Sequence, residues 1–134
     1  MKTDARPLAL HFYNRSTLVV ARELLGCNIL FRNNDTLFSG RIVETEAYIG
    51  MDDPACHAAV GKTTRNAVMF GPPGISYVYF IYGMYNCLNV VTEEDGYPAA
   101  VLIRAIEPIK GIEVMQQNRN KTRLKDLGSG PGKL

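Results

Sequence analysis

The segment YVYFIYGMYNCLN, from Tyr77 to Asn89, most constrains the fold, because it concentrates four of the chain's seven tyrosines and one of its five phenylalanines. Aromatic and β-branched residues favour strands, and Gly83 interrupts the run where a glycine lets the backbone turn. The pattern predicts a strand, a tight turn and a return strand that continues as NCLNVVT. The hairpin tip would carry the large side chains Tyr82, Met84 and Tyr85.

Two interpretations of this hairpin tip follow from its residue types. A cluster of large apolar side chains on a hairpin has the shape of a wedge, and such wedges enter base stacks and fill the space of a displaced nucleotide. Alternatively, the aromatic residues pack in a core, as tyrosine and phenylalanine usually do. Asn86 and Asn89 follow the tip, and an asparagine amide can hydrogen-bond a base edge, although Asn86 could equally serve the turn.

The segment RIVETEAYIG, residues 41–50, carries a second motif. Successive side chains of a strand point to opposite faces. One face would hold Ile42, Glu44, Glu46 and Tyr48, and the core face would hold Val43, Thr45, Ala47 and Ile49. Carboxylates on a rigid strand beside an aromatic ring can have raised pKa values suited to general-base work. The alternative is an exposed sheet face with salt-bridged glutamates.

Two helices are expected from apolar stripes at helical spacing. Residues 16–25 form the first, with Ser16 as its N-cap and Gly26 as its stop. Residues 109–120, IKGIEVMQQNRN, form the second. Both would flank the sheet.

Further strands and one long loop complete the pattern. Strands are expected at 27–32, 37–50 and 99–107, the first two joined as a hairpin and the third ended by Pro108. Residues 51–74 mix a short helix starting at Pro54 with a loop marked by glycine and proline. We therefore expect a mixed α/β (α+β) fold, with a curved, mainly antiparallel sheet, flanking helices and a protruding β-hairpin.

Length and composition indicate one domain over residues 1–134, because 134 residues make one ordinary domain and 46% apolar with 21% charged residues is close to globular averages. No segment approaches the about 20 apolar residues of a membrane span. The N-terminus lacks a signal-peptide cleavage site. We expect no membrane association and an intracellular location: cytoplasm or nucleoid in a bacterium, nucleus in a eukaryote.

The positions of the cysteines, histidines and charged residues indicate which disulfides, metal sites and charged partners to expect. The spacing of Cys27, Cys56 and Cys87 fits neither a disulfide framework nor paired metal ligands, so we expect reduced thiols. With His11 and His57 as the two histidines, a protein-built metal site is not expected. Six lysines and arginines against two acidic residues over 110–134 indicate either a polyanion-docking region or a solvated basic tail.

Five motifs in order, GRIVETEAYIG, DDPACHAA, TTRN, YVYFIYGMYNCLNV and VLIRAIEP, resemble those of the alkyladenine (3-methyladenine) DNA glycosylases of the methylpurine type. The resemblance covers about His11 to Leu134. It implies a monofunctional base-excision enzyme that flips an alkylated or deaminated purine out of duplex DNA and hydrolyses its N-glycosidic bond. Expected substrates are of the 3-methyladenine, 7-methylguanine and hypoxanthine class. The resemblance implies a monomer without a cofactor or metal.

The same resemblance assigns catalytic and base-binding roles position by position. Glu46 matches the carboxylate that deprotonates the attacking water, and Arg104 matches the arginine that helps hold that water and the adjoining phosphate. Glu44 would be structural. The base-binding residues would be Tyr48, His57 and Tyr79, which sandwich the flipped base, and Asn89, which hinders the exocyclic amine of guanine.

DNA contacts are implied for a further set of positions. Tyr82 matches the intercalating wedge, flanked by Met84 and Tyr85. Contacts to the DNA backbone are implied for Lys62, Thr63, Arg65 and Lys133. Because no lysine falls inside the constellation of Glu46, Tyr48 and Asn89, strand cleavage through an amine nucleophile is not expected.

Members of this family continue past the GPGKL segment, whereas this chain ends at Leu134. Missing residues would remove packing and part of the lesion pocket. A non-catalytic DNA-binding module of the same fold is therefore the alternative to an active hydrolase.

Overall fold

The structure is a computed structural model that describes residues 6–50, 61–63, 66–81 and 85–119. Its strands form one five-stranded sheet in the order β1-β2-β5-β4-β3, and every neighbouring pair is antiparallel. The strands are β1 (Asn28–Asn33), β2 (Thr36–Ile49), β3 (Ser76–Ile81), β4 (Tyr85–Val91) and β5 (Ala99–Lys110). The helices of the described residues are α1 (Leu10–Tyr13), α2 (Thr17–Leu24), α3 (Ile112–Arg119) and the 3-10 helix η2 (Ala67–Phe70).

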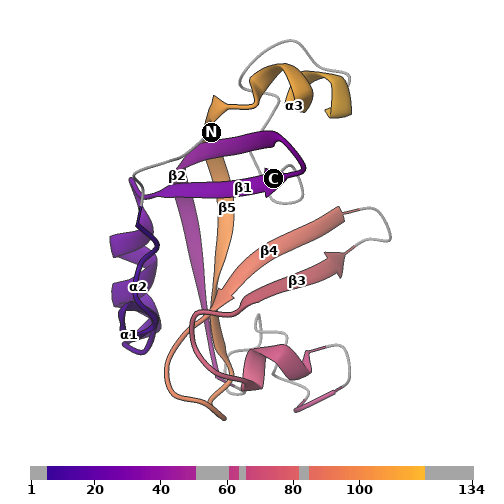
Figure 1. The fold of residues 1–134 in the computed structure, drawn as a ribbon. Coiled ribbons are helices and arrows are strands. Elements are labelled where there is room, and N and C mark those ends of the chain that lie inside the picture. The colour runs from indigo at the N-terminus through magenta and orange to yellow at the C-terminus, as the bar shows by residue number, and fades with distance from the viewer. Residues whose placement is uncertain (1–5, 51–60, 64–65, 82–84, 120–134) are drawn as a thin grey trace.

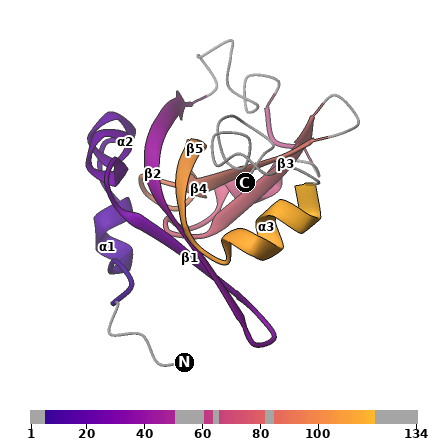
Figure 2. The same cartoon turned by 90° about the horizontal axis from the view of Figure 1, so that it is seen from above.

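The curled antiparallel sheet with its helices confirms the predicted mixed α/β (α+β) fold. Helices α1 and α2 lie on one side of the β2–β5 pair, and the β3–β4 hairpin projects on the other (Figure 1). The view from above shows the same separation (Figure 2). The aromatic run forms the expected hairpin, with backbone pairs from Ser76↔Val90 to Ile81↔Tyr85. Its predicted tip, residues 82–84, lies outside the described residues.

The β2–β5 pair contains an irregularity that changes the predicted faces of β2. Ile42 pairs with Ile106, but Glu44 pairs with Ala105, so Val43 has no partner in the register. A β-bulge of this kind shifts the alternation of side chains by one residue. Ile42 is consequently buried in the cluster under α2, whereas Val43 is 45% exposed. The prediction that Val43 faces the core and Ile42 shares the carboxylate face is wrong for this reason.

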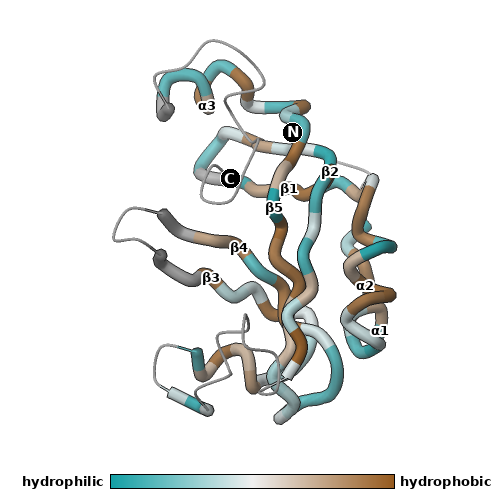
Figure 3. Tube along the Cα trace, turned by 180° about the vertical axis from the view of Figure 1, so that it is seen from behind, coloured by the Kyte–Doolittle hydropathy of each residue, from teal (hydrophilic) through white to brown (hydrophobic). Residues whose placement is uncertain are grey.

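Two hydrophobic clusters lie on opposite faces of the sheet. The buried residues that join α2 to the sheet are Val20, Ala21, Leu24, Ile42, Val101 and Ile103. Those of the other cluster, which packs η2 against the opposite face, are Met69, Tyr77, Val91 and Ala100. The central strand β5 contributes to both clusters because its successive residues alternate between the faces. Figure 3 shows hydrophobic residues running along this strand.

Helix α2 ends before Gly26, whose φ of 86° is a left-handed value that glycine adopts without a Cβ clash. Ser16 occupies the N-cap position, but its side chain makes no capping hydrogen bond. The carboxylate of Glu93 instead accepts hydrogen bonds from the backbone N of Thr17, at 3.3 Å, and from the Thr17 hydroxyl. The predicted capping role of Ser16 is therefore wrong, because a residue distant in sequence satisfies the first helical donor.

The end of β5 also differs from the prediction. The strand continues through Pro108, which pairs with Gly40, to Lys110. Since β4 pairs with β5 only at Ala100–Leu102, the later part of β5 is free of β4, and a proline is tolerated at such an edge. Helix α3 accordingly begins at Ile112 and not at residue 109.

The segment predicted as a loop before the aromatic hairpin contains regular structure. Residues Ala67–Phe70 form η2, and its Met69 is 1% exposed. The helix predicted at Pro54 lies outside the described residues. Over the residues that are described, no helix has both the length and the apolar content needed to cross a membrane.

Candidate active site

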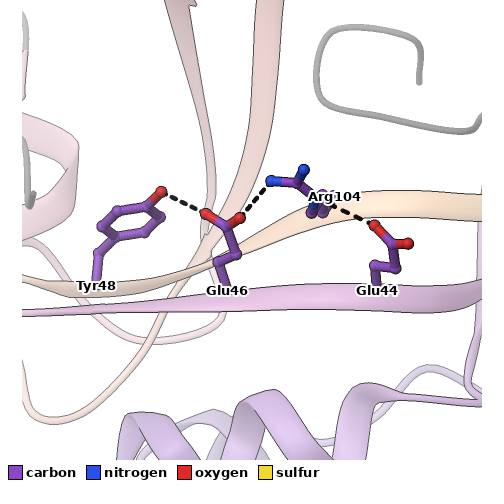
Figure 4. A network of polar contacts seen from close by, with 4 residues as sticks. All are labelled: Glu44, Glu46, Tyr48 and Arg104. Atoms are coloured by element: carbon purple, nitrogen blue, oxygen red, sulfur yellow. Dashed lines mark hydrogen bonds and ion pairs between the residues drawn. The ribbon is translucent and has the colours of Figure 1, made fainter.

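The carboxylate of Glu46, on β2, is held by two other side chains. One oxygen, Oε2, accepts a hydrogen bond from the Tyr48 hydroxyl at 2.5 Å. The other, Oε1, accepts one from Nη1 of Arg104, also at 2.5 Å. Figure 4 shows the four residues Glu44, Glu46, Tyr48 and Arg104 side by side along β2 and β5. With its side chain 34% exposed, Glu46 is fixed in orientation yet open to water.

Arg104 bridges the two glutamates of the ETEAY segment. Its Nε donates to Oε2 of Glu44 at 3.1 Å while its Nη1 contacts Glu46. Glu44 and Glu46 are two residues apart, so they share one face of β2. The hydrogen bond and the charge of Glu46 raise the pKa of Arg104, with a smaller contribution from Glu44. The guanidinium therefore stays a cation between two carboxylates.

Tyr48 is the residue whose pKa the site changes most among those described. Burial, the hydrogen bond to Glu46 and the negative charge of Glu46 together raise the pKa of Tyr48 to about 12. A tyrosine with this pKa keeps its proton throughout the physiological range. The hydroxyl is consequently a permanent hydrogen-bond donor to Glu46.

Paired residues on four neighbouring strands form one row that includes Glu46 and Asn89. Glu46 pairs with Leu102, Leu102 pairs with Asn89, and Asn89 pairs with Tyr77. Directly paired side chains point to the same face of a sheet, and neighbouring strands lie about 4.8 Å apart. Asn89 therefore lies on the same face as Glu46, two strands away.

The side chain of Asn89 is fixed by the hairpin itself. Its Nδ2 donates to the backbone oxygens of Tyr77 and Cys87, both at 3.2 Å, and the residue is 4% exposed. An amide has two N–H donors, so both are used within the β3–β4 hairpin. What remains for a ligand is the carbonyl oxygen Oδ1 and the shape of the side chain.

Cys87, on β4, is a buried thiol. Burial raises its pKa, and the charge of Glu46 raises it further. A thiol with a raised pKa is protonated and weakly nucleophilic near neutral pH. Cys27 and Cys87 are free thiols, and Cys56 lies outside the described residues.

Two of the residues predicted to contact the DNA backbone lie before η2. Lys62 is exposed, with its Nζ 5.9 Å from the ring centroid of Phe70. The backbone N of Thr63 donates to Oδ1 of Asn66 at 2.7 Å, and the backbone N of Asn66 donates to the Thr63 hydroxyl at 3.3 Å. Thr63 and Asn66 are thus joined by reciprocal hydrogen bonds just before η2, and Asn66, at the N-cap position of η2, makes no side-chain capping hydrogen bond to that helix.

The structure describes the predicted site residues unevenly. It brings together Glu46, Arg104 and Tyr48 and places Asn89 on the same face. Tyr79 and Tyr85 lie in β3 and β4 through their backbone pairs with Cys87 and Ile81. The predicted residues outside the described ones are His57, Arg65, Tyr82, Met84 and Lys133. Their roles stay predictions.

Sequence reasoning missed two contacts made by residues that it had singled out. Glu44, expected to be structural, binds the same arginine as Glu46. Its position two residues before Glu46 was a usable signal, since both side chains share a face of the strand. The second is the Thr63–Asn66 pair, which matches no capping motif that the sequence could have shown.

These contacts define what the site can do chemically. Tyr48 and Arg104 each occupy one oxygen of the Glu46 carboxylate, and each oxygen has a further lone pair. A carboxylate that is oriented in this way and can hold a water is suited to general-base catalysis. In the described part of the chain, no group of three or more His, Cys, Asp or Glu side chains could hold a metal ion.

A model of the methylpurine-DNA glycosylase family matches residues 11–134. A protein of Methanocella arvoryzae named "Putative 3-methyladenine DNA glycosylase" is 62% identical over 124 residues, which cover 92% of this chain and 62% of that protein. A protein of the same name from Koribacter versatilis is 53% identical over 130 residues, which cover 96% of this chain and 63% of that protein. Another, from the Wolbachia of Brugia malayi, is 67% identical over 106 residues, which cover 77% of this chain and 60% of that protein. The chain spans about three fifths of the length of these relatives.

Proposed function

The chain belongs to the methylpurine-DNA glycosylase family, and from this premise we propose that it acts in DNA repair by removing damaged purines from duplex DNA. The observation that carries the proposal is the Glu46 carboxylate, held between the Tyr48 hydroxyl and the Arg104 guanidinium on an open face of the sheet. The reaction class is hydrolysis of an N-glycosidic bond.

Glu46 acts as the general base in this proposal. A water bound at its carboxylate loses a proton to Glu46 as the oxygen bonds to the sugar's anomeric carbon. The glycosidic bond breaks at the same carbon, and its electron pair leaves with the base. An alkylated purine is already cationic and departs as a neutral base, whereas hypoxanthine departs as an anion that takes its proton from water. Arg104 orients the carboxylate and, through its positive charge, attracts the adjoining phosphate.

The proposed substrates are purines of the 3-methyladenine, 7-methylguanine and hypoxanthine class. Stacking of a flipped base on the Tyr48 ring would bring its sugar beside Glu46, because the Tyr48 hydroxyl is bonded to that carboxylate. Electron-rich rings attract a cationic purine, and His57 and Tyr79 are proposed to complete the slot. The buried side chain of Asn89 would limit the space for an exocyclic amine.

The proposed partner is duplex DNA, bound by a monomer. Tyr82, Met84 and Tyr85 are proposed to fill the space of the displaced nucleotide. Positive charge for the phosphates would come from Lys62, Arg65 and Lys133. Since Cys87 has a raised pKa and no lysine is assigned to the site, the proposed reaction proceeds without a covalent intermediate.

The test is single-turnover release of 3-methyladenine and of hypoxanthine from a duplex by the 134-residue chain, compared with Glu46→Gln. We expect the variant to lose at least about 10²-fold in rate, the usual contribution of a general base, while it retains binding to the lesion duplex. The matched control is Glu107→Gln, which removes an exposed carboxylate from β5 and should keep the wild-type rate.

Each outcome decides between named alternatives. Full turnover by Glu46→Gln would show that another group is the base. Binding without release by the folded wild-type chain would favour a non-catalytic DNA-binding module, which the sequence left open. Loss of release in both glutamate variants would show that charge in general, and not Glu46, sets the rate.

A further inference from the structure

We propose that Glu44 is a positioning residue that holds Arg104 against Glu46. The inference rests on the proposed function, in which Glu46 is the general base. It assigns to Glu44 a role in the reaction that it performs without touching the substrate. The role follows from how one guanidinium is shared between two carboxylates.

The geometry gives each glutamate a different nitrogen of Arg104. Glu44 accepts from Nε at 3.1 Å, and Glu46 accepts from Nη1 at 2.5 Å. Because the guanidinium is planar and rigid, fixing Nε on one carboxylate also fixes the direction of Nη1 toward the other. Without Glu44, the group keeps one anchor and can rotate about its side-chain bonds.

The strand register supports this arrangement independently. Between Glu44↔Ala105 and Thr45↔Ile103, the register of β5 skips Arg104, just as it skips Val43 on β2. The arginine is thereby released from direct pairing with one residue of β2. Its guanidinium can lie between two side chains that are two residues apart on the same face (Figure 4).

The exposure of the Arg104 and Glu44 side chains indicates that their ion pair adds little to the stability of the fold. The side chains of Arg104 and Glu44 are 44% and 55% exposed, and exposed ion pairs contribute little to the free energy of unfolding. A long solvated side chain has many rotamers to lose on ordering. The Glu44 carboxylate therefore affects the orientation of Arg104 and contributes little to the free energy of unfolding.

The first measurement is the Nε–Hε resonance of Arg104 in the ¹⁵N-labelled chain, which reports its hydrogen bond without any turnover. We expect slow exchange of this proton with water in the wild type and fast exchange in Glu44→Ala. The matched control, Glu107→Ala, removes an exposed carboxylate of β5 and should leave the resonance unchanged.

The second measurement is a double-mutant cycle on single-turnover base release. Glu44→Ala should lower the rate by up to about 10²-fold, the scale of a misplaced catalytic contact, and Glu107→Ala should not. In an Arg104→Met background, Glu44→Ala should have less than a twofold effect, because Glu44 acts through Arg104. The midpoint of urea unfolding should stay within error for Glu44→Ala.

The outcomes separate this inference from the function on which it rests. An unchanged Arg104 resonance in Glu44→Ala would overturn the inference whatever the activity. A changed resonance with a wild-type rate would also overturn it, as would an equal loss of rate in the Arg104→Met background. If the wild-type chain releases no base, the proposed function fails, while the resonance still decides whether Glu44 anchors Arg104.

Discussion

The hydrogen bond from Tyr48 to Glu46 depends on the proton of the Tyr48 hydroxyl. Burial and the Glu46 carboxylate raise the pKa of this tyrosine to about 12. A group whose pKa is raised on folding contributes stability that is complete below its unfolded pKa, near 10, and is lost as the pH rises through the folded value. The pH range in which this contact weakens is therefore about 10 to 12.

We expect one of the seven tyrosines to ionise near pH 12 in an absorbance titration at the phenolate band, and to be missing in Tyr48→Phe. In Glu46→Gln its pKa should fall, because a carboxylate charge is removed, but remain above the ordinary value because burial persists. Tyr97→Phe removes a different tyrosine and serves as the control. An unchanged late titration in Tyr48→Phe would assign the shift to another residue.

At the scale of elements, the irregularity in the β2–β5 pair decides which residues of β2 are core and which are site. Ile42 joins the cluster beneath α2, while Val43 is left unpaired and exposed. After the bulge, alternation resumes with Thr45 toward α2, where its hydroxyl donates to the backbone oxygen of Ala21 at 2.9 Å. The carboxylates thereby face away from the helix.

The bulge makes a testable prediction about two adjacent residues. Ile42→Ala should lower the free energy of unfolding by about 3 kcal/mol, as large-to-small changes in cores do. Val43→Ala should lower it by less than about 1 kcal/mol, because exposed positions tolerate substitution. Urea denaturation of both variants measures the difference. Equal losses, or a larger loss at Val43, would mean that β2 alternates without a bulge.

The whole molecule places helix α2 and its candidate site on opposite faces of one sheet. Helix α2 packs against one face, and η2 packs against the other, which also carries Tyr48 and its partner Glu46. The net charge of +2 is small, so binding to a polyanion would depend on where individual lysines and arginines lie. Lys62 lies before η2, with its Nζ 5.9 Å from the ring centroid of Phe70, and Phe70 and Tyr48 pack against the same hydrophobic cluster.

Lys62 therefore gives a prediction for the molecule as a DNA-binding surface. Lys62→Gln should weaken binding to duplex DNA and reduce the slope of log K against log salt by about 1, the value for one lost phosphate contact. Arg22→Gln, an exposed position on α2 at the opposite face of the sheet, is the control with the same charge change. Fluorescence anisotropy over a series of salt concentrations measures both. Equal slopes for Lys62→Gln and the wild type would remove Lys62 from the interface.

Much of the fold could be predicted from the sequence because its signals are local. Strand alternation and turn residues predicted both hairpins, and the apolar stripe ended by Gly26 predicted α2. The shared face of Glu44, Glu46 and Tyr48 followed from the same alternation. The predicted end of β5 at Pro108 was wrong, since whether a proline is tolerated depends on the neighbouring strand.

The sequence by itself determined the five strands, helices α2 and α3, the antiparallel class and the carboxylate face, because backbone periodicity and turn chemistry act over a few residues. Only the tertiary structure decided that Glu93 caps α2, that Ile42 and not Val43 is buried, and that Arg104 lies between two glutamates. Arg104 meets these partners 58 and 60 positions away. Contacts at such separations depend on the register of β2 against β5, which packing across the whole sheet sets.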